Sequence, residues 1–251
     1  DKRMFYTILP KGSDHPVFYH FGSRYFVTQK DAPWLTKDIR ITKMYTLSWI
    51  TLQEGALRPA INRFVDEIKS VRKQYGVADL PVGVDLPDVY LIRAFQENRI
   101  EWEDAWKPMF KARLIKTKDE VELLRMSASL GDAMYDAVGR AIRPGMRENE
   151  IQAIANHTLY ALGADEVVGL NCMSGPRTNP NHHEGTSDRI IRPGDLMFLD
   201  TFHSLNGYRT CYYRTFCAGR ATKAQKESYR AAHNMMFDAI KKVKPGATTV
   251  E

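Results

Sequence analysis

The chain has 251 residues, of which 43% are hydrophobic and 26% charged, as in a folded globular protein rather than a disordered one. Its net charge is +6, but lysine and arginine are spread along the whole length without a basic block or an RNA-binding aromatic motif, so we expect no nucleic-acid partner. No run approaches the roughly 18 consecutive apolar residues of a membrane span, and the first residues lack the pattern of a signal peptide, so we expect no membrane association.

The three cysteines favour a reducing compartment and do not have the spacing of a zinc-binding module. Cys172, Cys211 and Cys217 match neither a disulfide framework nor a CxxC zinc module. A reducing environment is the simpler setting for them, so we expect a cytoplasmic protein. The sequence does not begin with methionine and stops shortly after a predicted helix, so we expect both ends to be cuts through a longer protein.

The first part of the chain alternates short strands with helices. Its predicted strands are runs of aromatic and β-branched residues separated by Gly, Pro and Asp, at 4–9, 17–21, 39–46 and 81–85. Segment 56–76 has an apolar residue at every third or fourth position and ends at Gly76, as an amphipathic helix does. This alternation predicts an α/β domain over residues 1–108.

The second part opens with a helix start at Thr117. Thr117 and Glu120 have the spacing of a capping box, in which each side chain accepts a hydrogen bond from an otherwise unpaired backbone N–H. Apolar residues then recur at helical spacing up to the turn at 143–145. Further helices are predicted at 148–162 and 223–243, and strands at 166–175, 195–202 and 207–219.

Five ordered motifs of this second part resemble those of the pita-bread family, which includes creatinase, aminopeptidase P, prolidase and methionine aminopeptidase. They are RLIKTKDEVELLR, RPGMRENEI, RPGDLMFLD, GY followed by RTF, and KPGATTVE. The resemblance implies an α+β fold, with the first half of a pita-bread catalytic domain at 109–251 and a creatinase-type N-terminal domain at 1–108. It also implies that the start of the N-terminal domain and the second half of the catalytic domain lie outside the sequence, and that the protein is a homodimer.

The resemblance places a metal site at residues 200 and 211, where this sequence departs from the family. In the metal-dependent members two aspartates on adjacent strands, a histidine and two glutamates hold two divalent ions about 3.5–4 Å apart. Asp200 stands where the first aspartate is expected, and Cys211 stands where the second is expected. A thiolate binds zinc or iron but lacks the two-oxygen bite that bridges two hard ions, so we expect no dinuclear centre and no cofactor.

A histidine takes over the chemistry in creatinase, the metal-free member of the family. By family spacing back from Gly194, His183 occupies that position, or His182 if the loop differs by one residue. We therefore expect His183 to act as the acid and base, with His182 as the alternative and Asp200 as a catalytic or orienting carboxylate.

Four further residues are candidate substrate-binding groups, namely Arg214, Arg177, Tyr213 and Thr210. The planar guanidinium of Arg214 suits either an ion pair with Asp200 or a clamp on a substrate carboxylate. Because strand residues alternate, one of Tyr212 and Tyr213 faces the core, while the other could offer its ring to a cationic substrate.

Cys211 has three interpretations. It is a small residue that fills a position in a strand, a ligand of one divalent metal such as Mn, Co, Zn or Fe together with Asp200 and His183, or a nucleophile. His203 likewise is either a residue at a strand end or a further ligand in a rearranged mononuclear site with Asp200 and Cys211.

Three functions follow from these residues. The main hypothesis is a creatinase-like hydrolase that cleaves a C–N bond of a small, nitrogen-rich metabolite by histidine acid–base catalysis. The first alternative is a metal-dependent Xaa-Pro peptidase or a dimethylsulfoniopropionate lyase, whose loop resembles SGPRTNP at 174–180. The second alternative is a catalytically inactive pita-bread module that has kept only a binding role.

Overall fold

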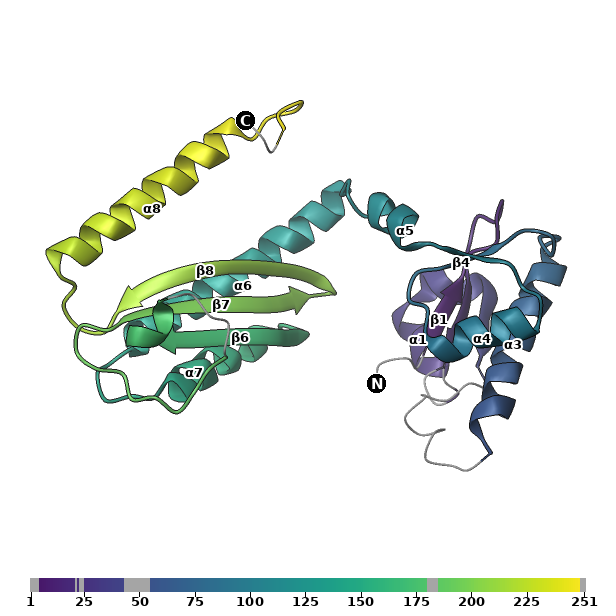
Figure 1. The fold of residues 1–251 in the computed structure, drawn as a ribbon, viewed down its shortest axis with the longest axis horizontal. Helices are drawn as coiled ribbons and strands as arrows, with labels where there is room; N and C mark the ends of the chain where they lie inside the picture. The colour runs from purple at the N-terminus through teal and green to yellow at the C-terminus, as the bar shows by residue number, and fades with distance from the viewer. Residues whose placement is uncertain (1–4, 21, 23–24, 43–54, 180–184, 249–251) are drawn as a thin grey trace. The chain divides into compact units, whose positions relative to one another are not determined.

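Two compact units make up the chain, Asp1–Ile115 and Lys116–Glu251 (Figure 1). The computed structural model describes residues 5–20, 22, 25–42, 55–179 and 185–248. Each unit has its own hydrophobic core. The division follows residue 115, whereas the sequence places the limit at 108. The assignment of the first unit to a creatinase-type N-terminal domain stays a prediction.

The first unit combines two small sheets with helices. Its strands are β1 (Phe5–Ile8), β2 (Val17–His20), β3 (Ile39–Ile41), β4 (Val82–Val84) and β5 (Trp102–Asp104). Strand β2 pairs antiparallel with β1 and parallel with β3, and β4 pairs in parallel with β5. Its helices are α1 (Tyr25–Asp31), the 3₁₀ helix η2 (Pro33–Asp38), α3 (Leu57–Gln74), α4 (Val89–Glu97) and α5 (Trp106–Ala112).

The apolar stripe predicted for segment 56–76 lies in the core of this unit. Val65 and Ile68 of α3 are buried together with Phe95 of α4. Of the strand predicted at 39–46, the structure shows Ile39–Ile41 as β3, and residues 43–46 lie outside the described part of the chain.

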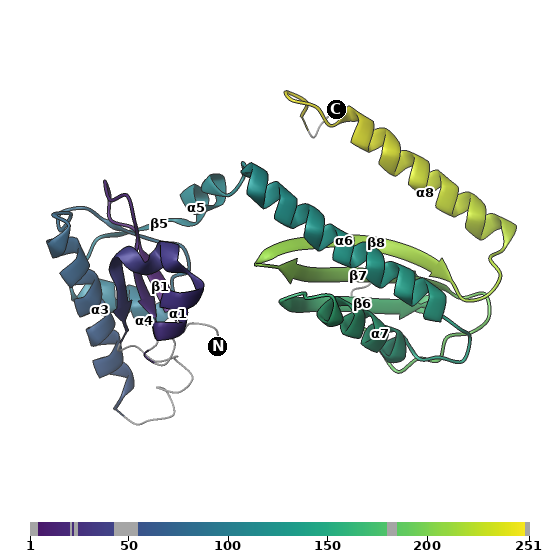
Figure 2. The same ribbon diagram turned by 180° about the vertical axis from the view of Figure 1, so that it is seen from behind.

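The second unit is an antiparallel sheet with helices across one face. Its strands are β6 (Glu166–Ser174), β7 (Leu196–Leu205) and β8 (Tyr208–Cys217), in the order β6-β7-β8. Its helices are α6 (Lys118–Ala141), α7 (Glu148–Ala161) and α8 (Lys223–Lys242), with a short 3₁₀ helix, η3 (Gly175–Thr178), after β6. Figure 2 shows α6 and α7 lying over the same face of the sheet, whereas no residue of α8 is buried.

The predicted capping box starts α6. The hydroxyl of Thr117 accepts from the N–H of Glu120, and the carboxylate of Glu120 accepts from the N–H of Thr117. The core of the unit then forms between the helices and the sheet, where Met134, Ile151 and Leu199 are fully buried. One face of the sheet is thereby used for folding, and the other is left to carry a site.

A two-residue turn fixes the register of β7 and β8. Asn206 and Gly207 both have positive φ, as a type I′ turn requires, and Leu205 pairs with Tyr208 on either side of them. The carboxylate of Asp165 accepts hydrogen bonds from the backbone N–H groups of Asn206 and Gly207, at 2.8 and 2.7 Å. The register of the hairpin decides which side chains share a face of the sheet, so this turn positions the candidate site.

No helix in the described part of the chain combines the length and the hydropathy that a bilayer-crossing segment needs.

We expect Cys172 to be unreactive in the folded protein. It is fully buried in β6, and burial, reinforced by the nearby charge of Glu148, raises the pKa of its thiol to about 12. Because the thiolate is the reactive form, Ellman's reagent at about pH 8 should label only Cys211 and Cys217 until denaturant is added. The Cys211→Ser, Cys217→Ser double variant is the control, and a rapidly reacting thiol in that folded variant would contradict the burial of Cys172.

Candidate active site

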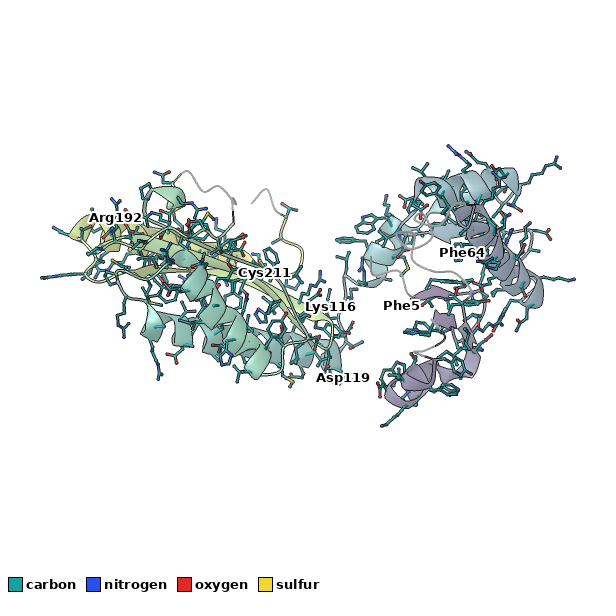
Figure 3. The ribbon with its side chains drawn as sticks, turned by 90° about the horizontal axis from the view of Figure 1, so that it is seen from below. Phe5, Phe64, Lys116, Asp119, Arg192 and Cys211 are labelled. Carbon is teal, nitrogen blue, oxygen red and sulfur yellow. The ribbon has the colours of Figure 1, made fainter. Side chains whose placement is uncertain are left out.

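The face of the sheet that α6 and α7 leave uncovered carries Asp200, Cys211 and Tyr213; we call it the open face. Asp200 lies directly opposite Tyr213, and Cys211 precedes Tyr213 by two residues on β8, so strand alternation puts all three side chains on one face. The side chain of Tyr212, between Cys211 and Tyr213 on β8, points to the opposite face of the sheet. Its hydroxyl donates to the carbonyl of Ala128 on α6 at 2.7 Å. Figure 3 labels Cys211 on its strand.

Asp200 and Cys211 are in contact on the open face. The Cys211 Sγ donates a hydrogen bond to Asp200 Oδ1 at 3.6 Å, across the diagonal of the strand pair. Asp200 is 1% exposed, whereas Cys211 is exposed. Partial burial, followed by the charge of Asp200 and this hydrogen bond, raises the pKa of the Cys211 thiol above its ordinary value. The thiol therefore acts as a neutral donor to the carboxylate.

Tyr213 is the tyrosine that faces the open side, which settles the choice between the two adjacent tyrosines. It is 48% exposed, and its ring centroid lies 6.3 Å from that of Phe198. The charge of Asp200, more than burial, raises the pKa of the Tyr213 phenol. The phenol is accordingly protonated at neutral pH beside the carboxylate, and its ring is available to a ligand.

Asn171 completes a row across the sheet that sequence reasoning missed. It pairs with Asp200 from β6, so Asn171, Asp200 and Tyr213 are neighbours on three adjacent strands. The sequence alone does not predict that Asn171 pairs with Asp200, because a bulge between Val167 and Gly169 shifts the register of β6.

Arg214 is not beside Asp200, which corrects the expected ion pair and substrate clamp. It lies on the helix-facing side of β8, with its guanidinium carbon 4.7 Å from the ring centroid of Tyr212 and 5.6 Å from that of Tyr135. Its Nη1 donates to the carbonyl of Tyr213 at 2.8 Å, and its Nη2 is 3.9 Å from Asp132. Arg214 therefore fastens β8 to α6. The sequence could have predicted this side for Arg214. An Asn-Gly hairpin turn sets a register that pairs residue 214 with residue 199 rather than with residue 200.

Thr210 and His203 also lie on the helix-facing side. His203 is fully buried, and its Nε2 is 2.7 Å from the carbonyl of Ser127 and 3.2 Å from the hydroxyl of Thr210. The hydroxyl of Thr210 is also 3.1 Å from that of Ser127. Thr210 therefore does not reach the open face as a substrate-binding group, and His203 does not join Asp200 and Cys211 as a ligand.

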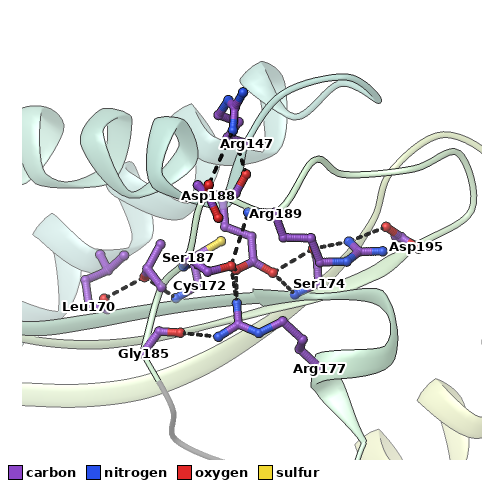
Figure 4. Close-up of polar contacts among 12 residues, drawn as sticks. Arg147, Leu170, Cys172, Ser174, Arg177, Gly185, Ser187, Asp188, Arg189 and Asp195 are labelled. Atoms are coloured by element: carbon purple, nitrogen blue, oxygen red, sulfur yellow. Dashed lines mark hydrogen bonds and ion pairs between the residues drawn. The ribbon is translucent and has the colours of Figure 1, made fainter.

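Arg177 and the two candidate histidines belong to the segment after β6. Arg177, labelled in Figure 4, forms an ion pair with Glu148, which is fully buried, so its guanidinium is held within the fold. His182 and His183 lie outside the described residues, and their roles stay predictions.

The donor set on the open face does not fit a carboxylate-bridged pair of metal ions. Such a centre needs carboxylates whose two oxygens reach two hard cations, and the position beside Asp200 offers a single sulfur atom instead. Within the described ranges, no group of three or more His, Cys, Asp or Glu side chains gathers as a metal site would require. A reaction step that needs two carboxylate-bridged cations therefore lacks its second carboxylate at this position.

The sequence of the second unit is similar to that of known metallopeptidases. The family model of metallopeptidase family M24 matches residues 122–251. The "Xaa-Pro dipeptidase" of Pyrococcus furiosus is 28% identical over 139 residues, which are 55% of this chain and 40% of that protein. The "Xaa-Pro dipeptidase" of Pyrococcus horikoshii is 25% identical over 192 residues, which are 74% of this chain and 55% of that protein.

Solved structures confirm the expected α+β pita-bread fold. An X-Pro aminopeptidase from Thermotoga maritima MSB8 superposes with a TM-score of 0.74 at 18% identity, covering 94% of this chain and 62% of that one. The prolidase from Pyrococcus furiosus gives 0.72 at 21% identity, with the same shares of the two chains. The chain thus spans less than two thirds of the length of these relatives.

Proposed function

Since the chain belongs to metallopeptidase family M24, we propose that the protein hydrolyses a C–N bond of a small, nitrogen-rich substrate by acid–base catalysis, without a dinuclear metal centre. The family supports hydrolysis of C–N bonds, because its relatives are named dipeptidases. The departure from the family at Cys211 supports a metal-free route. A homodimer and a cytoplasmic location remain predictions.

One observation carries the proposal. Cys211 donates its thiol hydrogen to Asp200 at 3.6 Å, at the position where the resemblance calls for a second metal-bridging carboxylate. The thiol of Cys211 and the phenol of Tyr213, on the same face, stabilise the single carboxylate of Asp200. A dinuclear site instead needs Asp200 and a second carboxylate to bind the same two cations.

In the proposed reaction the chain's own groups move the protons. His183 takes a proton from water as the water attacks the carbon of the C–N bond, and the resulting imidazolium protonates the departing nitrogen. Asp200 accepts a hydrogen bond from a substrate N–H and so orients the substrate, with the ring of Tyr213 beside it.

A metal-dependent Xaa-Pro peptidase is the second candidate, favoured by the names of the two Pyrococcus relatives. It would need Cys211 to lose its proton and bind a metal beside Asp200, which suits one zinc or iron ion better than a pair of hard ions. A lyase and an inactive binding module stay as alternatives that an activity screen decides.

We expect turnover that survives removal of metal. The full protein is assayed with small amidines, lactams and ureas and with Xaa-Pro dipeptides, before and after dialysis against a chelator. A non-peptide substrate should be cleaved equally well in both samples, because the acid–base groups belong to the chain. Xaa-Pro cleavage that the chelator abolishes and manganese restores would contradict the proposal, as would no hydrolysis of any compound in either sample.

The variant Cys211→Ser separates the two candidates further. Serine can donate to Asp200 in place of the thiol, so the proposed hydrolase should keep most of its turnover, whereas a metal-ligand role for the sulfur predicts loss of both metal and activity. Cys217→Ser, on the same strand, is the matched control and should behave as the unaltered protein does under either candidate.

A further inference from the structure

A cavity of about 250 Å³ lies where β8 ends and α8 begins; we call it the α8 pocket. Its lining includes, from β8 and α8, Phe216, Cys217, Gln225, Lys226, Tyr229 and Arg230. Cys217 is six residues beyond Cys211 on β8, which is about 20 Å along a strand. The α8 pocket is therefore separate from the pair formed by Asp200 and Cys211.

The connection between β8 and α8 is fixed by hydrogen bonds. Ala218, just after β8, is fully buried, and its N–H donates to the carbonyl of Asp195 at 2.9 Å. Its carbonyl accepts from the N–H of Gly194 at 2.7 Å. On α8, Nε2 of Gln225 donates to the carbonyl of Gly194 at 3.0 Å. The first turn of α8 is thus tied to the turn before β7, and the side chains that α8 contributes to the pocket stay beside the end of β8.

The α8 pocket carries positive charge that no carboxylate of the chain neutralises. The one acidic residue between 215 and 230 is Glu227, whose carboxylate lies 3.8 Å from Nζ of Lys223. Within the described part of the chain, neither Lys226 nor Arg230 forms an ion pair. The two are four residues apart, so they lie on one face of α8, where like charges repel. An anion in the pocket would relieve this repulsion.

The other walls of the pocket are mainly apolar. Phe216 belongs to the core of the second unit, with its ring centroid 6.2 Å from that of Tyr135. Leu196 of β7 and the ring of Tyr229 also line the cavity. A bare inorganic anion would leave these surfaces unused, whereas a carboxylate on an aromatic or aliphatic body would contact both the rings and the cations.

We propose that the α8 pocket binds a small organic anion, whose carboxylate is held by Lys226 and Arg230 and whose apolar body lies against Phe216 and Tyr229. The inference goes beyond the proposed hydrolysis and does not rest on it, because the pocket includes none of the residues given a part in that reaction.

Cys217 reports the charge of the pocket in the full protein. Iodoacetate and iodoacetamide alkylate thiols by the same reaction but differ in charge, so the ratio of their rate constants measures the local field, and the fraction of thiolate cancels. Trypsin cleaves after Arg214 and Arg220, which puts Cys211 and Cys217 in separate peptides for mass spectrometry. We expect this ratio to be at least about 10-fold higher at Cys217 than at Cys211, which contacts the carboxylate of Asp200.

Two double variants test whether the pocket cations cause this difference. Lys226→Gln, Arg230→Gln should lower the ratio at Cys217 by about 5-fold or more at 0.1 M salt. Lys241→Gln, Lys242→Gln is the matched control, since it removes the same charge about 15 Å or more away along α8, beyond the Debye length of about 10 Å. It should leave the ratio within about 2-fold. All four side chains are exposed, so both variants should fold.

Benzoate probes the binding of an organic anion, and benzamide is its neutral match in shape. Benzoate should protect Cys217 from iodoacetamide with a half-effect at about 10 mM or below, and should leave Cys211 unprotected. Benzamide and inorganic phosphate should each need at least about a 10-fold higher concentration, because one lacks the charge and the other the apolar body. The Lys226→Gln, Arg230→Gln variant should lose the protection by benzoate.

Each contrary result overturns a stated part of the inference. A ratio at Cys217 no higher than at Cys211, or an equal fall in both double variants, would overturn the cationic pocket. Equal protection by benzoate and benzamide would overturn the preference for an anion, and equal protection by phosphate would overturn the role of the apolar walls. No protection by benzoate at about 50 mM would overturn the site itself. None of these results depends on hydrolysis or on sensitivity to a chelator, so the proposed function is decided separately.

Discussion

Replacing Gly131 with alanine is expected to lower the free energy of unfolding of the second unit by about 3 kcal/mol. Gly131 is buried on α6, where an added Cβ would overlap the hydroxyl of Tyr212 and lie 2.8 Å from its Cζ and 3.0 Å from Cε1 of His203. The Tyr212 ring would have to move, and its hydrogen bonds to Ala128 and Asp132 would be lost.

The predicted loss of stability in Gly131→Ala is opposite in sign to the usual effect of this substitution in a helix. Alanine in place of glycine within an ordinary helix stabilises it by about 1 kcal/mol, so a loss reports the close approach of α6 and β8. Urea unfolding measures it. Tyr212→Phe removes the hydroxyl that the new methyl group meets first, so Gly131→Ala should cost less in that background. A Gly131→Ala variant that is more stable than the unaltered protein would show that α6 does not pack against β8 in this way.

Replacing His183 with alanine is expected to reduce turnover by about 10²–10⁴-fold, the range that a positioned acid–base group contributes. Substrate binding should change less than kcat, because Asp200 and Tyr213 remain on the open face. Steady-state kinetics on the cleaved substrate measures both constants. Unfolding should be unaffected, since the core of the second unit lies between the sheet and its two covering helices.

His182→Ala is the matched control, because it makes the same change one residue away. It should keep turnover within a few-fold of the unaltered protein. Loss of turnover in His182→Ala alone would assign the acid–base role to that residue. Full activity in both variants would show that neither histidine carries the chemistry.

Local signals in the sequence predicted the elements of the second unit well. The capping box at Thr117 and Glu120 is present, because it depends on residues only three positions apart. Strands β7 and β8 also lie where aromatic and β-branched runs predict them. Asp200 and Cys211 meet as the spacing suggested, since a two-residue Asn-Gly turn joins their strands.

The side of the sheet on which a residue lies was harder to predict. Arg214 was expected to pair with Asp200 or to hold a substrate carboxylate, and Thr210 was expected to bind substrate, yet both face α6, because a shift of one residue along a strand reverses the direction of a side chain. Asn171 was missed for another reason: β6 reaches β7 only after a long connection, and a bulge shifts its register.

The metal content of the full protein, purified without chelator and measured by inductively coupled plasma mass spectrometry, tests the central claim most directly. We predict less than about 0.1 divalent ion per subunit, because the sulfur of Cys211 stands where a bridging carboxylate is needed beside Asp200. About two equivalents of manganese, cobalt or zinc per subunit would contradict the claim and would make the metal-dependent Xaa-Pro peptidase the better account of the site.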